Sequence, residues 1–291
     1  MRKKKESQIT FSLTQKHAME IGASIRSRLV TVAKRAASKE TLKAKFPHTY
    51  IYSPPGLGKT FTVEKQLNIS GMQNYTISGN VSMFAFGISL AVIRYNSMND
   101  KPIIIVVDDC DEILKNETNI NIMKNILSGN KVYDYQMSLQ SQWKGLSSTQ
   151  QEAILAHSSS NKLGFTVPTD NFIFVFTSNF KLPTDDDVKN ARDKMQAKAN
   201  KMAHLNAIRS RCRPADFDLT DNEQWGWIAD VVMNENCVEL SHNEEVILLD
   251  WMYNNWDNMN ERSIRTAEKM AECMIEDPTG YRDSWEIDYL K

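Results

Sequence analysis

The residues best suited to chemistry lie in a glycine-rich turn between a predicted strand and a predicted helix. The turn reads Ser53-Pro54-Pro55-Gly56-Leu57-Gly58-Lys59-Thr60, and it follows the apolar run Tyr50–Tyr52. Glycines let the backbone wrap so that its N–H groups point inward, and the helix adds the positive end of its dipole. This arrangement predicts a phosphate cradle, in which Lys59 reaches the β- and γ-phosphates and the Thr60 hydroxyl binds Mg²⁺.

One position departs from the phosphate-loop motif G-x-x-x-x-G-K-[ST]. Ser53 stands where the motif has its first glycine. The change is mild, because Gly56 and Gly58 make the close approach to phosphate. The alternative interpretation is an ordinary Gly/Pro turn before a helix, and the Gly-Lys-Thr ending at a strand–helix junction argues against it.

A pair of carboxylates follows a second apolar run. Ile103–Val107 is β-branched throughout and ends in Asp108-Asp109. Such a run is typical of a strand that is buried on both faces of a parallel sheet, and open α/β sheets bind ligands at the carboxyl ends of their strands. We therefore expect Asp108 to be the carboxylate on the Mg²⁺ side and Asp109 to be the base that orients an attacking water. A polar turn after a strand is the alternative.

The elements that must position these residues alternate along the chain. Strands are expected near residues 49–52, 75–77, 103–107 and 172–177, with helices at 59–68, 81–97 and 119–128 between them. This alternation predicts an α/β fold with a doubly wound parallel sheet.

The remaining segments suggest additions to this core. Residues 13–45 have a basic helical pattern, 131–169 suggest an inserted hairpin with a strand at 132–137 and a loop at 147–160, and 185–206 suggest one polar helix. Three further helices are expected at 222–234, 243–255 and 261–276, as a small helical lid domain. The predicted domains are a basic helical segment (1–45), a nucleotide-binding α/β domain (46–219), and a helical lid with a tail (220–291).

Composition limits the class of protein. The 291 residues carry a formal net charge of −1, but basic residues dominate before the phosphate turn and acidic residues after Pro214. Such asymmetry favours nucleic-acid binding at one end or head-to-tail association of subunits. The four cysteines have no metal-ligand spacing, and no apolar run is long enough to span a membrane. We expect a soluble, intracellular, cytoplasmic protein.

Taken together, these motifs resemble those of the AAA+ ATPases. Ser53–Thr60 resembles the Walker A motif, Ile103–Asp111 the Walker B motif, and Phe174–Asn179 the sensor 1 strand. Ala207–Cys212 is similar to the Ser-Arg-Cys region of clamp-loader subunits, and Ser263-Ile264-Arg265 stands where a sensor 2 arginine would be.

The resemblance implies roles for single residues. Asn179 would hold a water or a phosphate oxygen, and Arg211 would reach the nucleotide of a neighbouring subunit, with Arg209 as the next candidate. Arg265 would report on nucleotide from the lid, with Arg262 as its rival. The nucleotide-binding residues would be Pro55, Gly56, Leu57, Gly58, Lys59, Thr60 and Phe61, and the metal ligands would be Thr60 and Asp108.

Two features bear on mechanism. Most relatives carry Glu where this chain has Asp109, so hydrolysis could be slow, with Asp111 or Glu112 as substitute bases. The run Ala85-Phe86-Gly87 resembles the pore loop of protein-threading rings. We favour the alternative that Phe84 and Phe86 belong to a buried helix start, because their neighbours are also apolar.

The resemblance therefore implies an ATP-hydrolysing, Mg²⁺-dependent enzyme that works as a ring of identical subunits, such as a hexamer. Its expected substrate is nucleic acid, DNA included, or nucleoprotein. One alternative is a protein-remodelling ring. The other is an assembly switch that binds ATP and hydrolyses it slowly.

Overall fold

The computed structural model describes residues 10–97, 101–128, 131–136, 142–158, 164–192, 196–235 and 237–291. The basic run Arg2–Lys5 therefore lies outside the described residues. The chain forms two compact units. One comprises Val32–Tyr52 and Val63–Asp216, and the other comprises the residues up to Thr31 together with Ser53–Thr62 and Phe217–Lys291. The predicted domain boundaries at residues 45 and 219 remain a prediction.

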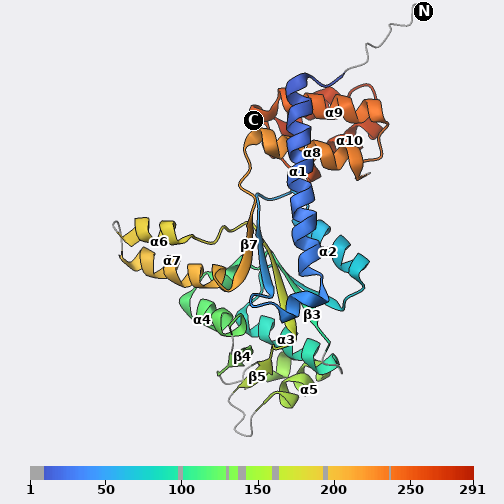
Figure 1. The fold of residues 1–291 in the computed structure, drawn as a ribbon. Coiled ribbons are helices and arrows are strands. Elements are labelled where there is room, and N and C mark those ends of the chain that lie inside the picture. Colours follow the sequence, from blue (N-terminus) through green and yellow to red (C-terminus); the bar gives the residue numbers. More distant parts are fainter. Residues whose placement is uncertain are drawn as a thin grey trace, which may run out of the picture. The chain divides into compact units, whose positions relative to one another are not determined.

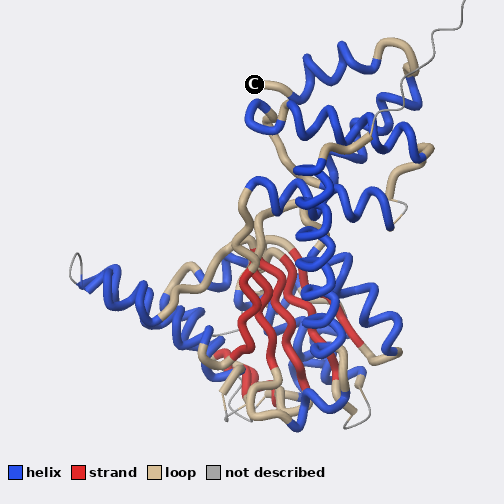
Figure 2. Tube along the Cα trace, turned by 45° about the horizontal axis from the view of Figure 1, so that its top comes forward, coloured by secondary structure: helices blue, strands red, loops and turns tan. Residues whose placement is uncertain are grey.

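A five-stranded parallel sheet forms the centre of the first unit, which confirms the expected fold class. The strand order is β2-β3-β6-β1-β7, and Figure 2 shows the strands in red, running side by side. The sheet is built from β1 (His48–Tyr52), β2 (Asn74–Ser78), β3 (Ile103–Asp108), β6 (Phe172–Ser178) and β7 (Cys212–Asp216). Its connecting helices include α2 (Lys59–Ser70), α3 (Met83–Asn96) and α4 (Glu117–Ile126).

The strand β7 was not expected from the sequence. It contains Arg213 and Pro214 instead of an apolar run, and it lies at the end of the strand order, paired with β1. Proline cannot donate a backbone hydrogen bond, so it is tolerated in an edge strand where one side of the ladder is open. A polar edge strand carries no burial pattern that could reveal it.

The register brings the ends of three central strands to one edge of the sheet. β6 lies between β1 and β3, with Thr177 paired to Ile51 on one side and to Asp108 on the other. Because all three strands are parallel, their carboxyl ends meet there. The segment after β6 therefore lies beside the segment after β3.

The insertion before β6 is a hairpin that carries a helix. β4 (Val132–Tyr135) pairs antiparallel with β5 (Phe165–Pro168), as expected for the hairpin. The expected loop at 147–160 is wrong, because α5 (Ser148–Ala156) lies there. Its start is fixed by a capping box between Ser147 and Gln150, which is a local signal that needs no long apolar period.

The aromatic residues at the start of α3 are packed, which confirms the buried-helix interpretation. Phe86 is fully buried, and Phe84 lies 5.1 Å from the Tyr135 ring and 6.5 Å from the Phe165 ring, centroid to centroid. The Tyr133 hydroxyl donates to the Met83 carbonyl over 2.7 Å. These contacts join the inserted hairpin to α3.

The segment expected as one helix at 185–206 forms two. α6 (Asp185–Arg192) and α7 (Gln196–Arg209) lie against each other, as Figure 1 shows. The first turn of α6 is capped by Thr184, whose hydroxyl accepts from the Asp187 N–H over 3.2 Å.

The second unit is helical. It contains the first part of α1 (Leu13–Ala36), and its aromatic residues Trp225, Trp227 and Trp285 are fully buried, as expected for a helix-bundle core. Gly22 and Gly226 bring two helix backbones into contact, since a Cβ on Gly22 would lie 2.1 Å from the Gly226 carbonyl carbon. The other helices are α8 (Asp221–Asn234), α9 (His242–Asn254), α10 (Ile264–Glu276) and α11 (Tyr281–Tyr289).

The basic helix α1 ends earlier than expected, at Ala36, and is followed by a short 3₁₀ segment (Lys39–Lys43). Two of its arginines contact residues of the same unit. Arg26 forms ion pairs with Asp230 and Glu235, and the Arg28 guanidinium lies 5.0 Å from the centre of the Phe217 ring. No helix in the described part of the chain combines the length and the apolar composition needed to span a bilayer.

Candidate functional site

The glycine-rich turn after β1 has the backbone geometry of a phosphate loop. Gly56 and Gly58 have φ values of 73° and 69°, in the left-handed region that glycine adopts without strain. Leu57 between them is 1% exposed, so its side chain anchors the turn. The turn leads directly into α2, which begins at Lys59.

The Lys59 side chain lies inside this turn. Its ammonium donates to the carbonyl oxygens of Ser53 and Pro54, each over 3.1 Å, and the residue is only 6% exposed. Ser53 is fully buried, and its hydroxyl donates to the Pro54 carbonyl over 2.9 Å. The serine at the first motif position is thus accommodated within the turn.

The start of α10 contacts the same turn. The Ile264 N–H donates to the Gly56 carbonyl over 2.9 Å. A Cβ on Gly56 would lie 2.2 Å from the Ser263 Cβ, closer than side-chain atoms approach one another. Gly56 is therefore required both by its positive φ and by this contact.

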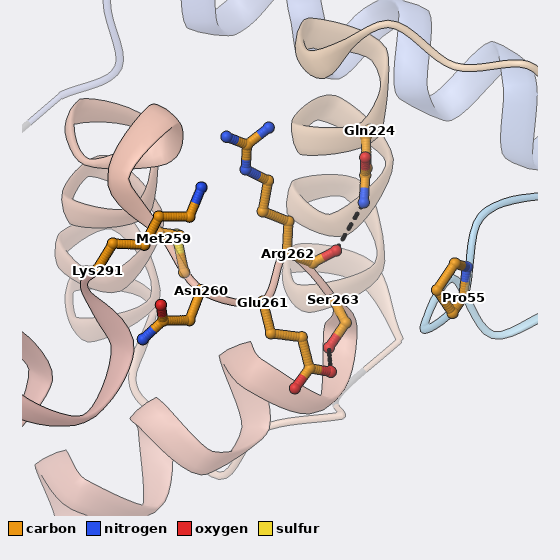
Figure 3. A pocket seen from close by; sticks show the side chains of 8 residues that line it. All are labelled: Pro55, Gln224, Met259, Asn260, Glu261, Arg262, Ser263 and Lys291. Atoms are coloured by element: carbon orange, nitrogen blue, oxygen red, sulfur yellow. Dashed lines mark hydrogen bonds between the residues drawn. The ribbon is translucent and has the colours of Figure 1, made fainter.

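A pocket of about 410 Å³ opens beside the turn, in the same unit. Figure 3 shows Pro55 on one side of it, with Arg262, Glu261 and Ser263 on the other. The Gln224 side chain donates to the Arg262 carbonyl over 2.6 Å, and the Ser263 hydroxyl donates to Glu261 over 2.7 Å.

The two candidate lid arginines have different surroundings. Arg262 lines the pocket, pairs with Asp221 over 2.9 Å and lies over the Trp256 ring at 5.4 Å. Arg265 is exposed in the first turn of α10 and does not line the pocket. Arg262 is thus held by its neighbours, whereas Arg265 is exposed.

Three consecutive residues, the last two of β6 and the next one, hold three aspartates at and just after the end of β3. The Thr177 hydroxyl donates to Asp108 over 2.5 Å, the Ser178 hydroxyl donates to Asp111 over 2.5 Å, and the Asn179 amide donates to Asp109 over 3.0 Å. The expected magnesium-side carboxylate, the expected base and the expected sensor residue therefore lie together. The roles of Thr177 and Ser178 were not predicted from the sequence, although both are polar residues at the end of an apolar strand.

The backbone at Asp109 is unusual. Its φ is 49°, in the left-handed region, and its N–H donates to the Thr177 carbonyl over 3.0 Å. Aspartate is among the few side chains that adopt this conformation readily. The chain turns sharply here, so Asp108 and Asp109 are directed differently although they are adjacent.

Cys110 is buried and lies in the sequence between Asp109 and Asp111. Its thiol donates to the carbonyl oxygens of Ile77 and Asp108, each at 3.3 Å. Burial, and then the charges of the three aspartates, raise the pKa of Cys110 to about 12. The thiol is therefore protonated at neutral pH.

The two substitute bases have other partners. Asp111 accepts the Ser178 hydroxyl, and Glu112 forms an ion pair with Lys115. Asp109, by contrast, accepts a hydrogen bond from the Asn179 amide.

The structure also separates the two candidate arginine fingers. Arg209 makes a two-pronged ion pair with Asp216, at 3.1 and 2.6 Å, and donates to the Leu182 carbonyl. Arg211 is half-buried and donates to the Ala207 carbonyl over 2.6 Å. Burial, and then the charge of Arg211, lower the pKa of Lys124, whose ammonium lies 2.9 Å from His204.

A comparison with protein families identifies a related family. The model of the ATPase family associated with various cellular activities (AAA) matches residues 49–199, which is just over half of the chain. The match runs from β1 into α7 and so includes the glycine-rich turn, the aspartates after β3 and Asn179. No curated protein matches the chain.

Proposed function

Since the chain belongs to the AAA family of ATPases, we propose that it binds ATP together with Mg²⁺ and hydrolyses ATP to ADP and phosphate. The observation that carries this proposal is the turn Ser53–Thr60, with two left-handed glycines and the Lys59 ammonium enclosed by its backbone. A buried ammonium in a glycine turn at a helix start is suited to a polyphosphate.

In this proposal, Pro55–Phe61 bind the nucleotide. Lys59 exchanges its carbonyl partners for the β- and γ-phosphates, and backbone N–H groups of the turn donate to phosphate oxygens. Arg265 is proposed to report on the nucleotide from the start of α10, where it is exposed, and Arg262, which lines the pocket, remains its rival.

The residues proposed as metal ligands fit Mg²⁺. Thr60 offers a hydroxyl and Asp108 a carboxylate, and both are the hard oxygen donors that this ion prefers. Thr177 fixes one oxygen of Asp108, which sets the direction of the carboxylate. Bound Mg²⁺ would neutralise charge on the phosphates as the terminal bond breaks.

Asp109 is proposed to orient the attacking water and to accept its proton as the oxygen attacks the γ-phosphorus and ADP leaves. Asn179 is proposed to hold that water or a γ-phosphate oxygen. The hydrogen bond between Asn179 and Asp109 supports the assignment, because it joins the two groups that must act on one water.

We further propose a ring of identical subunits in which Arg211 acts on the nucleotide of the neighbour. Arg209 is paired with Asp216, so Arg211 is the better candidate of the two. The substrate proposed for the ring is nucleic acid or nucleoprotein. Because Arg26 and Arg28 contact their own unit, this proposal depends on the exposed Lys34 and Arg35 and on the clamp-loader-like Ser-Arg-Cys region.

A slow assembly switch is the second candidate, and Asp109 favours it. Aspartate is one methylene shorter than the usual glutamate, and here its carboxylate is held by Asn179. The protein-threading alternative has less support, because Phe86 is buried and Phe84 packs against Tyr135 and Phe165.

One experiment tests the ATPase proposal. ATP affinity and turnover are measured for the parent, for Lys59→Ala and for Lys144→Ala, which removes an exposed lysine from the inserted segment. Only Lys59→Ala should lose ATP binding. Unchanged ATP affinity in folded Lys59→Ala would refute the proposal, and binding with negligible turnover in the parent would favour the switch.

A further inference from the structure

Asn179 lies between two residues that are themselves held in place. On one side, the Ser178 hydroxyl donates to Asp111 over 2.5 Å. On the other side, the Phe180 N–H donates back to the Ser178 oxygen over 2.8 Å. The backbone on both sides of Asn179 is thus fixed through one buried hydroxyl.

The same segment is tied to β1. The Tyr50 hydroxyl donates to the Phe180 carbonyl over 2.7 Å. Burial raises the pKa of Tyr50 well above its usual value, so the hydroxyl remains a donor at any physiological pH. Asp111, Ser178, Phe180 and Tyr50 form one chain of hydrogen bonds across the ends of β3, β6 and β1, which we name the β6 latch.

The chemistry of Ser178 makes Asp111 the anchor of this latch. A hydroxyl has one proton to donate, and a short bond of 2.5 Å to a carboxylate is the charge-assisted kind. Ser178 is 3% exposed, so water cannot easily replace this partner. Without Asp111, the buried hydroxyl would turn to the Phe180 carbonyl, which lies 3.3 Å away.

We infer that Asp111 is a positioning residue: through Ser178 it fixes the segment that aims the Asn179 amide at Asp109. It is not a substitute base. The inference rests on the proposed function, since the orientation of the Asn179 amide is expected to affect the rate of ATP hydrolysis.

The variant Asp111→Asn separates the two roles. Its side-chain oxygen still accepts the Ser178 hydroxyl, but an amide cannot take up a proton at neutral pH. Asp111→Asn should keep a turnover number within about threefold of the parent, whereas Asp111→Ala and Ser178→Ala should each lower it about tenfold or more, because small misplacements in an active site are costly. The KM for ATP should change little, since none of the four latch residues is among the proposed nucleotide-binding residues Pro55–Phe61.

The double variant Asp111→Ala/Ser178→Ala supplies a second criterion. Each change removes the same hydrogen bond, the one between Ser178 and Asp111. The double variant should therefore be no slower than the slower single variant. The control is an exposed hydroxyl–aspartate pair in the inserted hairpin, where Thr166 donates to Asp134 over 3.0 Å. Thr166→Ala and Asp134→Ala should leave turnover unchanged.

Hydrogen exchange tests the latch without requiring hydrolysis. In the nucleotide-free protein, amides of residues 179–182 should exchange faster in Asp111→Ala than in the parent, and at the parent rate in Asp111→Asn. A parent that hydrolyses no ATP would end the proposed function, while this measurement would still report on the latch. The inference is overturned if Asp111→Asn is as slow as Asp111→Ala while Ser178→Ala keeps the parent rate, or if Asp111→Ala changes neither exchange nor turnover.

Discussion

The Asn179 side-chain amide donates a hydrogen bond of 3.0 Å to the Asp109 carboxylate. Asn179 directly follows β6 and Asp109 directly follows β3. The bond holds the carboxylate in one direction before any water is in place. A base that is already paired must either share its partner with the water or release it.

The first prediction concerns this base. Asp109→Asn should leave ATP and Mg²⁺ binding nearly intact and slow hydrolysis about 10²-fold or more, because an amide cannot accept the proton of the water. Asp108→Asn should instead weaken the Mg²⁺-dependent steps, so that a higher Mg²⁺ concentration is needed for turnover. Turnover at saturating ATP, measured against Mg²⁺ concentration, distinguishes the two, and parental turnover in Asp109→Asn would place the base elsewhere.

The second prediction concerns the arginines before β7. Arg211→Ala should bind ATP normally and hydrolyse it poorly, and mixing it with Lys59→Ala should restore activity, since Lys59→Ala subunits still present Arg211. An arginine finger contributes about 10³-fold or more, so partial rescue is measurable. If mixed rings form and stay inactive, Arg211 does not act on a neighbour.

Arg209→Ala is the matched comparison for that experiment. It removes the two-pronged pair with Asp216 and a bond to the Leu182 carbonyl, and both partners are largely buried. Its main effect should be a lower melting temperature, which Arg211→Ala should not share.

The third prediction separates two groups of basic residues on α1. Arg26→Gln should lower the free energy of unfolding by about 1–3 kcal/mol, because it leaves the buried Asp230 carboxylate without its cation. The double change Lys34→Gln/Arg35→Gln should leave stability unchanged, since both side chains are exposed.

The same double change tests nucleic-acid binding. If Lys34 and Arg35 contact phosphates, the affinity of the parent for DNA should fall steeply with salt, and the double change should make that slope shallower. Binding by the parent that does not depend on salt would contradict a phosphate-contacting role for α1.

The fourth prediction concerns stability at low pH. His48 is buried, its Nδ1 accepts the Phe174 N–H over 3.2 Å, and burial followed by the charge of Lys131 lowers the pKa of His48 from 6.5 to about 3. A depressed pKa means that its contribution to stability is full above pH 6.5 and is lost as the pH falls towards 3. His48→Asn, which keeps an acceptor, should show a weaker dependence of the melting temperature on pH over this range. An unchanged dependence would mean that His48 does not govern it.

Different parts of the structure were visible in the sequence to different degrees. The strands β3 and β6 were predictable because they are buried on both faces and therefore read as continuous apolar runs. The phosphate turn was predictable because its glycines and lysine are fixed by local geometry. By contrast, β7 is a polar edge strand and α5 depends on a capping box, so neither has the apolar period on which the prediction relied.

The site was predictable in its residues but not in its contacts. Asp108, Asp109 and Asn179 were expected to act on one nucleotide, yet the pairing of Thr177, Ser178 and Asn179 with three aspartates requires the register between β3 and β6. Two parallel strands that are far apart in the sequence carry no local signal of their register. The contact between Gly56 and the start of α10 could not be predicted either, because the two segments are far apart in the sequence.

That contact has a consequence for the phosphate turn itself. In a trans peptide, the carbonyl and the following N–H point in opposite directions. Because the Gly56 carbonyl is directed at the Ile264 N–H, the Leu57 N–H faces away from α10. If this peptide rotated, the helix would lose an acceptor at its first residue and the turn would present an oxygen where it now presents a donor. A helix from a distant part of the sequence therefore decides the polarity that one peptide group of the turn offers to an anion.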